Sequence, residues 1–391
     1  MISYEAALEL IRSEHLGLSA RAISCTSALN RVLATDIVAP IDLPPFDNSA
    51  VDGFAVKAAT AQVGKCLPVM GSLRAATQTR TVLPEGFSAK IMTGAPIPMG
   101  ADAVVMKEHV AEAADGITVN IAVAPNDNIR FHGEDIKKGH LVCPAGSLVS
   151  PHLMGALCGL GIDRVLVYEP PKIRIVSTGD ELVCAPTSLS FGQVYYLVGP
   201  MLAAQCQQLG IKDVEFCLVK DDQRAVGAAI EMASDADIVL VTGGMSKGDY
   251  DFAYLALKQS EVGEIFYQGA WRPGKPLFFG ERQGSYFFGL PGNPVAAFIC
   301  FHVFVRPLIF QAMNAMSQCA TLQAKLGEDF TKKPGITVFA GAILNEENQL
   351  VVQKNQGSHQ IFNLSLAKAL AVLPDGKGLV KASELIHYFP L

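Results

Sequence analysis

The sequence predicts a multidomain α/β plus β protein whose central part is a doubly wound, mostly parallel sheet. Between residues 173 and 313, short apolar runs typical of strands alternate with segments of helical periodicity. Alternation of this kind builds right-handed βαβ units. On either side of this region the chain breaks into short apolar runs separated by Gly, Pro, Asn and Asp, which is typical of small β domains.

The pattern of expected strands and helices changes at two points along the chain of 391 residues. The first lies at Pro170 and Pro171, where alternating strands and helices begin, and the second lies near Leu322, where short strand-like runs return. Because a typical domain holds roughly 100 to 200 residues, we expect two to four domains.

The segment before the first boundary is expected to combine two helices with a small β domain. Apolar side chains at helical spacing, including Ala6 and Leu10, predict a helix over residues 3–14, and a second short helix is predicted over 27–34. Three prolines between residues 40 and 45 then force extended backbone. Short apolar runs from residue 56 to about 123 predict the β domain.

Strands and helices alternate in the central region. The expected strands cover residues 172–179, 214–220, 236–244 and 285–292, and the expected helices cover 195–210, 223–235 and 294–313. In an open α/β sheet, the loops that leave the carboxyl ends of the strands line the ligand crevice. We therefore expect functional residues in these loops.

The composition argues against several classes of protein. A net charge of -6 argues against broad nucleic-acid binding, which relies on a basic surface. The nine cysteines form no Cys-x-x-Cys pair and the eight histidines show no metal-ligand spacing, so neither a disulfide framework nor a zinc site is predicted. The longest apolar stretch, 295–305, is shorter than the roughly 18 residues of a membrane span. The acidic first residues do not resemble a secretory signal, so we place the protein in the cytoplasm.

Carboxylates follow three of the expected strands. The pairs are Asp180 and Glu181, Asp221 and Asp222, and Asp249 and Asp251. An acidic residue after a strand is often the N-cap of the next helix, and this alternative stays open for any one pair. Three pairs that converge on an anionic ligand make chemical sense if a hard divalent cation, most simply Mg²⁺, lies between them.

Three glycines and a serine supply candidate anion-binding groups. Gly243, Gly244 and Gly248 leave backbone amides open to phosphate oxygens, and Ser246 adds a hydroxyl donor. For any single glycine, a tight turn with positive φ is the alternative.

The run RPGKP places Arg272 and Lys275 on either side of a Pro-Gly turn at Gly274. A planar guanidinium and an ammonium point charge together suit an oxyanion such as phosphate.

Further candidates lie in three segments of the amino-terminal half. They are Asp52 in the segment 44–56, Thr93 in 91–96, and Arg130, Glu134 and Asp135 in 128–136. Turn capping explains Asp47 and Asn48 in the first segment, whereas Asp52, beside a glycine, is less easily explained in this way.

These segments, in this order, resemble the molybdopterin molybdenumtransferase family, the molybdenum insertases that include MoeA and the E domain of gephyrin. The motifs span essentially the whole chain: PPFDNSAVDGFAV, IMTGAP, IRFHGEDI, STGDELV, TGGMSKGDYD, RPGKP and GLPGNP. The family transfers molybdenum from molybdate to the dithiolene of adenylylated molybdopterin and releases AMP. The resemblance implies the same reaction here, with Mg²⁺ as a cofactor and molybdate and adenylylated molybdopterin as substrates.

The resemblance also implies an elongated homodimer with a cleft between subunits. The implied domains are an N-terminal platform (1–45 with 133–168), a β-rich insert (46–132), an α/β molybdopterin-binding domain (169–318) and a C-terminal β-barrel-like domain (319–391). The molybdopterin adenylyltransferase and molybdoenzyme chaperones are candidate partners, whereas nucleic acid and membranes are not.

Carried over position by position, the resemblance implies two sets of functional residues. The catalytic set is Asp52, Asp135, Glu181, Asp221, Asp251 and Lys275. The substrate-binding set is Thr93, Gly243, Gly244, Ser246, Gly248, Arg272, Gly274, Pro291, Gly292, Asn293 and Ser358. Asp221 and Asp251 are also the expected metal ligands.

Three departures from the family pattern concern the site. Residues 196–198 read Tyr-Leu-Val where the family has a polar segment such as Asp-Ser-Asn. Arg272 stands where the family has lysine, which keeps the charge but changes its geometry. A family arginine that helps to hold molybdate is replaced near residues 339–341, while Ser358 still matches the neighbouring serine.

Two principal functions are therefore compared. The first is a working insertase in which Arg272 and a histidine such as His359 compensate for the missing groups. The second is a diverged paralogue that binds the pterin nucleotide or a partner protein without completing the transfer. The retained carboxylates favour the first, because a scaffold has little need of acidic residues at three strand ends. The absent polar segment and tail arginine favour the second. Nucleotidyl transfer by the α/β domain is a third alternative, which the full-length resemblance disfavours.

Overall fold

The computed structural model describes residues 1–245, 252–315, 319–354 and 356–391. Contacts group the chain into two compact units, which are described separately. The first contains residues 1–35, 145–150 and 165–391, and the second contains residues 36–144 and 151–164. The four domain boundaries expected from the sequence remain predictions.

The centre of the first unit is a six-stranded sheet with the strand order β17-β14-β18-β22-β21-β19. Its parallel strands are β14 (Ile173–Thr178), β17 (Val214–Val219), β18 (Ile238–Thr242) and β22 (Ser285–Leu290). The antiparallel strands β21 (Phe278–Arg282) and β19 (Gly263–Tyr267) complete one edge. The four parallel strands agree with the alternating pattern of the sequence.

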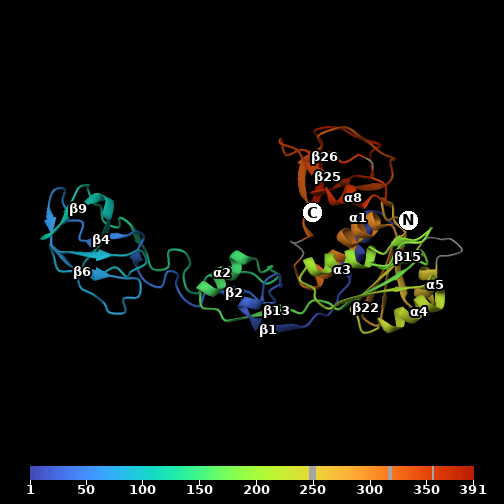
Figure 1. Cartoon of the computed structure of the whole chain (residues 1–391), viewed down its shortest axis with the longest axis horizontal. Coiled ribbons are helices and arrows are strands. Elements are labelled where there is room, and N and C mark those ends of the chain that lie inside the picture. Colours follow the sequence, from blue (N-terminus) through green and yellow to red (C-terminus); the bar gives the residue numbers. More distant parts are fainter. Residues whose placement is uncertain (246–251, 316–318, 355) are drawn as a thin grey trace. The chain divides into compact units, whose positions relative to one another are not determined.

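Helices cover both faces of this sheet because side chains alternate along its buried strands. On β18, Leu240 belongs to one hydrophobic core and Val239 and Val241 belong to another. Helices α3 (Val198–Gln208) and α6 (Pro294–Cys300) contribute to the first core, and α4 (Gln223–Met232) and α5 (Phe252–Gln259) contribute to the second. Figure 1 shows α4 and α5 side by side.

One helical segment, Pro294–Ala312, supplies much of the first core. It consists of α6, the π-helical segment η3 (Phe301–Val305) and α7 (Arg306–Ala312). The irregular turns immediately precede Pro307, which has no N–H and whose ring disfavours regular α-helical bonding. Its 19 residues are apolar enough to cross a membrane by length and composition, but 72% of its apolar window is buried inside the protein, as in a core helix.

A second six-stranded sheet lies in the carboxyl-terminal region, with the order β20-β25-β27-β29-β23 and β26 paired to β25. These strands are β20 (Trp271–Arg272), β23 (Leu322–Lys325), β25 (Thr337–Leu344), β26 (Leu350–Val352), β27 (Ala369–Leu373) and β29 (Leu385–Pro390). Strand β20 leaves the α/β region and pairs in parallel with β25, which sets Arg272 opposite Val338. The double winding of the first sheet and a barrel-like closure of the second remain predictions.

Shorter elements complete the first unit. They are β1 (Ala20–Ser24) paired with β13 (Arg164–Tyr168), β15 (Leu182–Val183) with β16 (Val194–Tyr195), β24 (Phe330–Thr331) with β28 (Leu379–Val380), and helix α8 (Ile361–Ser365).

The amino-terminal helix α1 (Tyr4–Ser13) begins at Ser3, whose hydroxyl accepts a hydrogen bond from the amide of Ala6 at 3.2 Å. Its buried residues follow helical spacing and are Tyr4, Ala7, Leu8 and Ile11. Ala6 and Leu10, two of the apolar positions from which the helix was predicted, are only partly buried.

The prediction of a second helix over residues 27–34 is wrong. The chain forms a short 3₁₀ turn, η1 (Cys25–Ser27), and Asn30 then adopts a φ of 59°. A left-handed residue interrupts an α-helix. Val32 and Leu33 instead form β-bridges with distant parts of the chain. These long-range partners are not encoded in the local apolar spacing.

The second unit is mostly β structure, as the sequence predicts for residues 56–123. Its larger sheet has the order β6-β7-β4-β8, from β4 (Gly53–Val56), β6 (Val69–Leu73), β7 (Ser88–Ile91) and β8 (Ala103–Met106). A second sheet joins β5 (Cys66–Leu67), β10 (Gly116–Val119) and β9 (Val110–Ala113). The remaining elements are the pairs β2 (Ile37–Val38) with β12 (Leu141–Cys143) and β3 (Asn48–Ser49) with β11 (Ile129–Arg130), the 3₁₀ turn η2 (Lys107–His109) and helix α2 (Pro151–Gly159).

Both faces of β4 are buried, because its side chains alternate between two cores. Phe54 and Val56 enter one core, whereas Ala55 enters the other.

Candidate functional site

Glycine-containing loops converge at the carboxyl edge of the parallel strands. Gly243 has a φ of 91°, and a Cβ there would lie 2.6 Å from the carbonyl oxygen of Thr178. A Cβ on Gly292 would lie 3.3 Å from the Cα of Gly243. The loops after β14, β18 and β22 therefore meet, and glycine is required at position 243 both for its φ and for the close approach.

Two loops that carry carboxylates, those after β14 and β17, also meet at this edge. Oδ1 of Asp221 accepts a hydrogen bond of 2.7 Å from the hydroxyl of Thr178, and the Asp221 amide donates one of 3.2 Å to Oδ1 of Asp180. Asp180 is exposed and Asp221 is half-buried, so both are accessible to a ligand. Glu181 is exposed in the same loop as Asp180.

The neighbouring carboxylate, Asp222, has a different role. It is the N-cap of α4, where its Oδ1 accepts hydrogen bonds from the amides of Arg224 at 3.0 Å and Ala225 at 2.9 Å. The N-cap alternative is therefore correct for Asp222 but not for Asp221.

Tyr196, from the segment that departs from the family pattern, lies beneath this edge. Its hydroxyl donates a hydrogen bond of 2.8 Å to Ser177 Oγ, and Thr242 Oγ1 donates one of 2.9 Å to the same atom. Burial raises the pKa of Tyr196 above its ordinary value. A Cβ on Gly199 would overlap the phenol, so Tyr196 fits because position 199 is glycine. The phenol thus joins two strand ends, β14 and β18, instead of facing a ligand.

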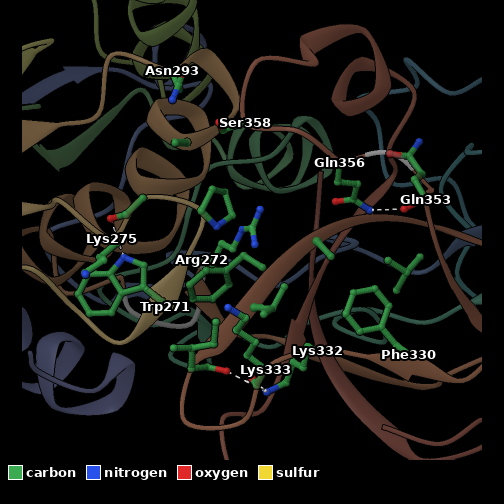
Figure 2. A pocket seen from close by; sticks show the side chains of 18 of the residues that line it. Trp271, Arg272, Lys275, Asn293, Phe330, Lys332, Lys333, Gln353, Gln356 and Ser358 are labelled. Atoms are coloured by element: carbon green, nitrogen blue, oxygen red, sulfur yellow. Dashed lines mark hydrogen bonds between the residues drawn. The ribbon is translucent and has the colours of Figure 1, made fainter. Parts of the chain in front are cut away.

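A cavity of about 1010 Å³ lies beside the carboxyl-terminal sheet, within the first unit (Figure 2). Six of the predicted site residues line it: Arg272, Gly274, Lys275, Pro291, Asn293 and Ser358. The sequence therefore identified residues that the fold brings together from three separate segments.

The RPGKP turn is held rigidly at the wall of this cavity. Trp271 is buried, and its indole N–H donates a hydrogen bond of 2.9 Å to the carbonyl of Gly274. Gly274 has a φ of 89°, and a Cβ there would overlap the sulfur of the fully buried Cys300. With the backbone fixed by these contacts, the exposed side chains of Arg272 and Lys275 project from it into the cavity.

Among the charged residues of the cavity lining, cations outnumber carboxylates. Besides Arg272 and Lys275, it contains three lysines that the sequence reading missed: Lys332, Lys333 and Lys354. The carboxylates of the lining are Glu328 and Asp329. Across the part of the chain that the structure describes, no ion pair engages Arg272 or Lys275, so both charges are available to an anion. The sequence signal for these residues was the Lys-Lys pair at 332–333, in the turn that leads into β25, the strand on which the family arginine was expected.

At the position of that arginine the wall is uncharged. Phe339 and Ala340 line the cavity and are 2% exposed. Gln356 also lines the cavity, and its side-chain amide accepts a hydrogen bond from the Gly341 amide and donates one to the Gly341 carbonyl, both at 2.7 Å. His359 is exposed and does not line the cavity, so the structure gives no support to compensation by this histidine.

One loop connects the carboxylate edge with the cationic cavity. Pro291 and Asn293 line the cavity, whereas Gly292 between them packs against Gly243 at the sheet edge. The two groups of residues therefore border a continuous region of the first unit.

The predicted residues of the second unit form two further groups. Oδ1 of Asp52 accepts hydrogen bonds from both the amide and the hydroxyl of Thr93, each at 2.8 Å. These bonds, the amide first, hold the pKa of Asp52 below its ordinary value. Asp52 and Thr93, proposed separately from the sequence, are thus one hydrogen-bonded pair.

Asp135 lines a cavity of about 570 Å³ together with Arg130 and Glu134. Nearby, Asp47 accepts a hydrogen bond of 2.7 Å from the His132 amide, and the Asn48 side chain donates one of 3.1 Å to the Phe46 carbonyl. The local hydrogen bond of Asn48 agrees with the turn-capping explanation, whereas Asp47 joins two segments that are far apart in the chain.

Four predicted residues, Ser246, Gly248, Asp249 and Asp251, lie outside the described residues. Within the described ranges, no group of three or more His, Cys, Asp or Glu side chains is arranged to hold a metal ion.

Three family models match consecutive parts of the chain. They are the MoeA N-terminal region (domain I and II) at residues 2–161, the probable molybdopterin binding domain at 174–311 and the MoeA C-terminal region (domain IV) at 323–391. The fold and its site therefore define a MoeA-like multidomain protein with a molybdopterin-binding α/β domain.

Similar proteins extend this match over nearly the full length. A molybdopterin molybdenumtransferase from Haemophilus influenzae is 36% identical over 377 residues, covering 94% of this chain and 93% of the relative. One from Staphylococcus aureus is 32% identical and covers 98% of this chain and 94% of the relative. The crystal structure of the molybdopterin biosynthesis moeA protein from Pyrococcus horikoshii OT3 has 29% identity and a TM-score of 0.82, with both chains fully covered. The chain belongs to the molybdopterin molybdenumtransferase family, as its motifs predicted.

Proposed function

We propose that this chain acts in molybdenum cofactor biosynthesis, where it transfers molybdenum from molybdate to adenylylated molybdopterin and releases AMP. The observation that carries the proposal is the loop at 291–293, which borders both a cavity lined by cations and a glycine-lined edge that bears carboxylates. A reaction between an oxyanion and a nucleotide-linked pterin needs both environments next to each other.

The roles divide according to charge. Arg272 and Lys275 are suited to molybdate, because a guanidinium fork and an ammonium together balance two negative charges. Gly243, Gly244 and Gly292 let backbone approach the phosphoanhydride closely. Asp221, oriented by the Thr178 hydroxyl, is placed to position the water that cleaves the adenylate.

A magnesium ion fits this chemistry at the carboxylate edge. Mg²⁺ is usually held by one or two carboxylates together with substrate phosphates and water. Asp221, whose amide donates a hydrogen bond to the Asp180 carboxylate, supplies one carboxylate, and we assign Asp251 as the second metal ligand. When bound, the cation would offset the charge of the phosphates.

We also propose a cytoplasmic homodimer with its cleft between the subunits, as the family resemblance implies. The second unit supports this proposal, because Asp52, Thr93 and Asp135 match family active-site positions. The adenylyltransferase and molybdoenzyme chaperones are the proposed protein partners. Sedimentation of the purified chain tests the dimer.

A paralogue that binds without transfer is not favoured, because the near-full-length relatives are named as transferases. AMP release from adenylylated molybdopterin by the purified protein with Mg²⁺ tests the choice. Release that depends on molybdate is expected. Tight binding of the pterin nucleotide without release, in the presence of molybdate, would instead identify a binding protein.

A further inference from the structure

The cavity lacks a charged group at the position where the family holds molybdate with an arginine. That part of the wall consists of Phe339, Ala340 and the neutral side chain of Gln356. Burying an oxyanion against such a wall is costly unless another cation faces it. A replacement must come from a different segment.

The turn that leads into β25 supplies candidate cations. Lys332 and Lys333 both line the cavity, and β25 enters the sheet beside β20, which carries Arg272. Thr337 lies opposite Trp271 in this pairing, and its amide donates a hydrogen bond of 2.9 Å to the Ala270 carbonyl. The pairing of β20 with β25 therefore brings the segment that follows the two lysines next to the start of the RPGKP turn.

The two lysines have different partners. The Lys332 ammonium donates hydrogen bonds to the carbonyls of Ile336 at 2.9 Å and Lys333 at 3.5 Å, so it braces the turn from inside. The turn is further fixed by a hydrogen bond of 2.8 Å from the Gly335 amide to the Asp375 carbonyl. Lys332 is consequently a structural group.

Lys333 projects from this braced turn toward the space that the Arg272 side chain enters (Figure 2). Its side chain is exposed, and in the described ranges no carboxylate pairs with it or with Arg272. Two cations that share one space repel each other unless an anion lies between them. A tetrahedral oxyanion would relieve this repulsion and gain hydrogen bonds from both groups.

We propose that Lys333 is the third cation of the oxyanion site, together with Arg272 and Lys275, and takes over the role of the absent arginine. The proposal deepens the proposed function and rests on it for the identity of the anion, molybdate. An ammonium on a flexible stem is a point charge, so it recognises the charge of the anion more than its orientation.

Equilibrium binding of molybdate to the full chain, measured by calorimetry, tests Lys333 directly. Lys333→Ala is expected to weaken binding about 10- to 100-fold, the range for loss of one charged hydrogen bond. Lys333→Arg is expected to restore most of the affinity. Lys325→Ala on β23 is the matched control, because Lys325 is an exposed lysine outside the cavity lining, and it should leave binding unchanged.

Thermal unfolding of each variant shows whether the fold is intact, and AMP release separates the two proposals. If the unaltered chain binds molybdate and Lys333→Ala binds equally well, the inference is wrong although the transferase function stands. If Lys333→Ala loses binding but the unaltered chain releases no AMP, the transferase proposal fails and the oxyanion site stands. Failure of the unaltered chain to bind molybdate would overturn the role of Lys333.

Discussion

Replacement of Gly274 by alanine tests how strongly the RPGKP turn depends on its packing. Two costs are expected. The φ of 89° places an L-residue in the left-handed region, at about 1–2 kcal/mol. The added Cβ would also overlap the Cys300 sulfur, well inside the normal contact distance, and overpacking of a buried site costs about 1–3 kcal/mol.

A double-mutant cycle separates these two terms. Gly274→Ala alone is expected to lower the free energy of unfolding by about 2–5 kcal/mol, the sum of both costs. In a Cys300→Ala background the overlap is removed, and only the backbone cost of about 1–2 kcal/mol should remain. The coupling energy between the two positions is thus expected to be about 1–3 kcal/mol.

Denaturant unfolding of the four proteins measures this coupling, and molybdate titration of the same samples shows whether the turn presents its cations correctly. Gly274→Ala removes no charge, so any loss of molybdate affinity reports displacement of Arg272 and Lys275. Equal destabilisation by Gly274→Ala with and without the Cys300 sulfur would refute the packing argument.

Three further predictions concern other parts of the site. Asp221→Asn is expected to slow AMP release by about 10²–10⁴-fold, as for loss of a group that orients or activates water. Asp222→Asn is the control and should leave the rate unchanged, because asparagine is an equally good N-cap. Similar rates for both variants would remove the assigned role of Asp221. Thr93→Val should raise the pKa of Asp52, because it removes the hydroxyl donor and keeps the amide donor. A lowered carboxyl pKa stabilises the fold at pH values above about 4, the ordinary carboxyl pKa, and this stabilisation is lost as pH falls through the folded-state pKa. The difference in stability between Thr93→Val and the unaltered chain should therefore vanish in acid. NMR titration of Asp52 and unfolding against pH check both expectations, and an unshifted pKa would contradict the argument. Gly341→Arg should tighten molybdate binding in a calorimetric titration by restoring a cation to the neutral wall, and unchanged affinity would mean that the cations already present suffice.

Local sequence patterns predicted the elements whose partners are near in the chain. The apolar runs of β14 and β18 and the helical spacing of α4 are local signals, and the structure places all three as expected. Helical spacing of apolar residues gave a wrong prediction over residues 27–34, because Val32 and Leu33 form β-bridges with residues far along the chain. Local periodicity contains no information about such partners.

The candidate site shows the same division. The motif RPGKP identified Arg272 and Lys275, but nothing in the motif indicated that β20 pairs with β25 and brings Lys333 to the same cavity. Asp221 and Asp222 are adjacent and chemically identical in sequence, and only their hydrogen bonds separate the proposed site residue from the helix cap.

By itself the sequence determined the family, the chemical types of the site residues and the regular elements, because motifs and periodicity are properties of neighbouring residues. Only the tertiary structure decided which of those residues share a cavity, which carboxylate is a cap and which lysines complete the cationic wall. Pairing between distant strands and the close approach of glycine loops bring these groups together, and both depend on contacts between segments far apart in the chain.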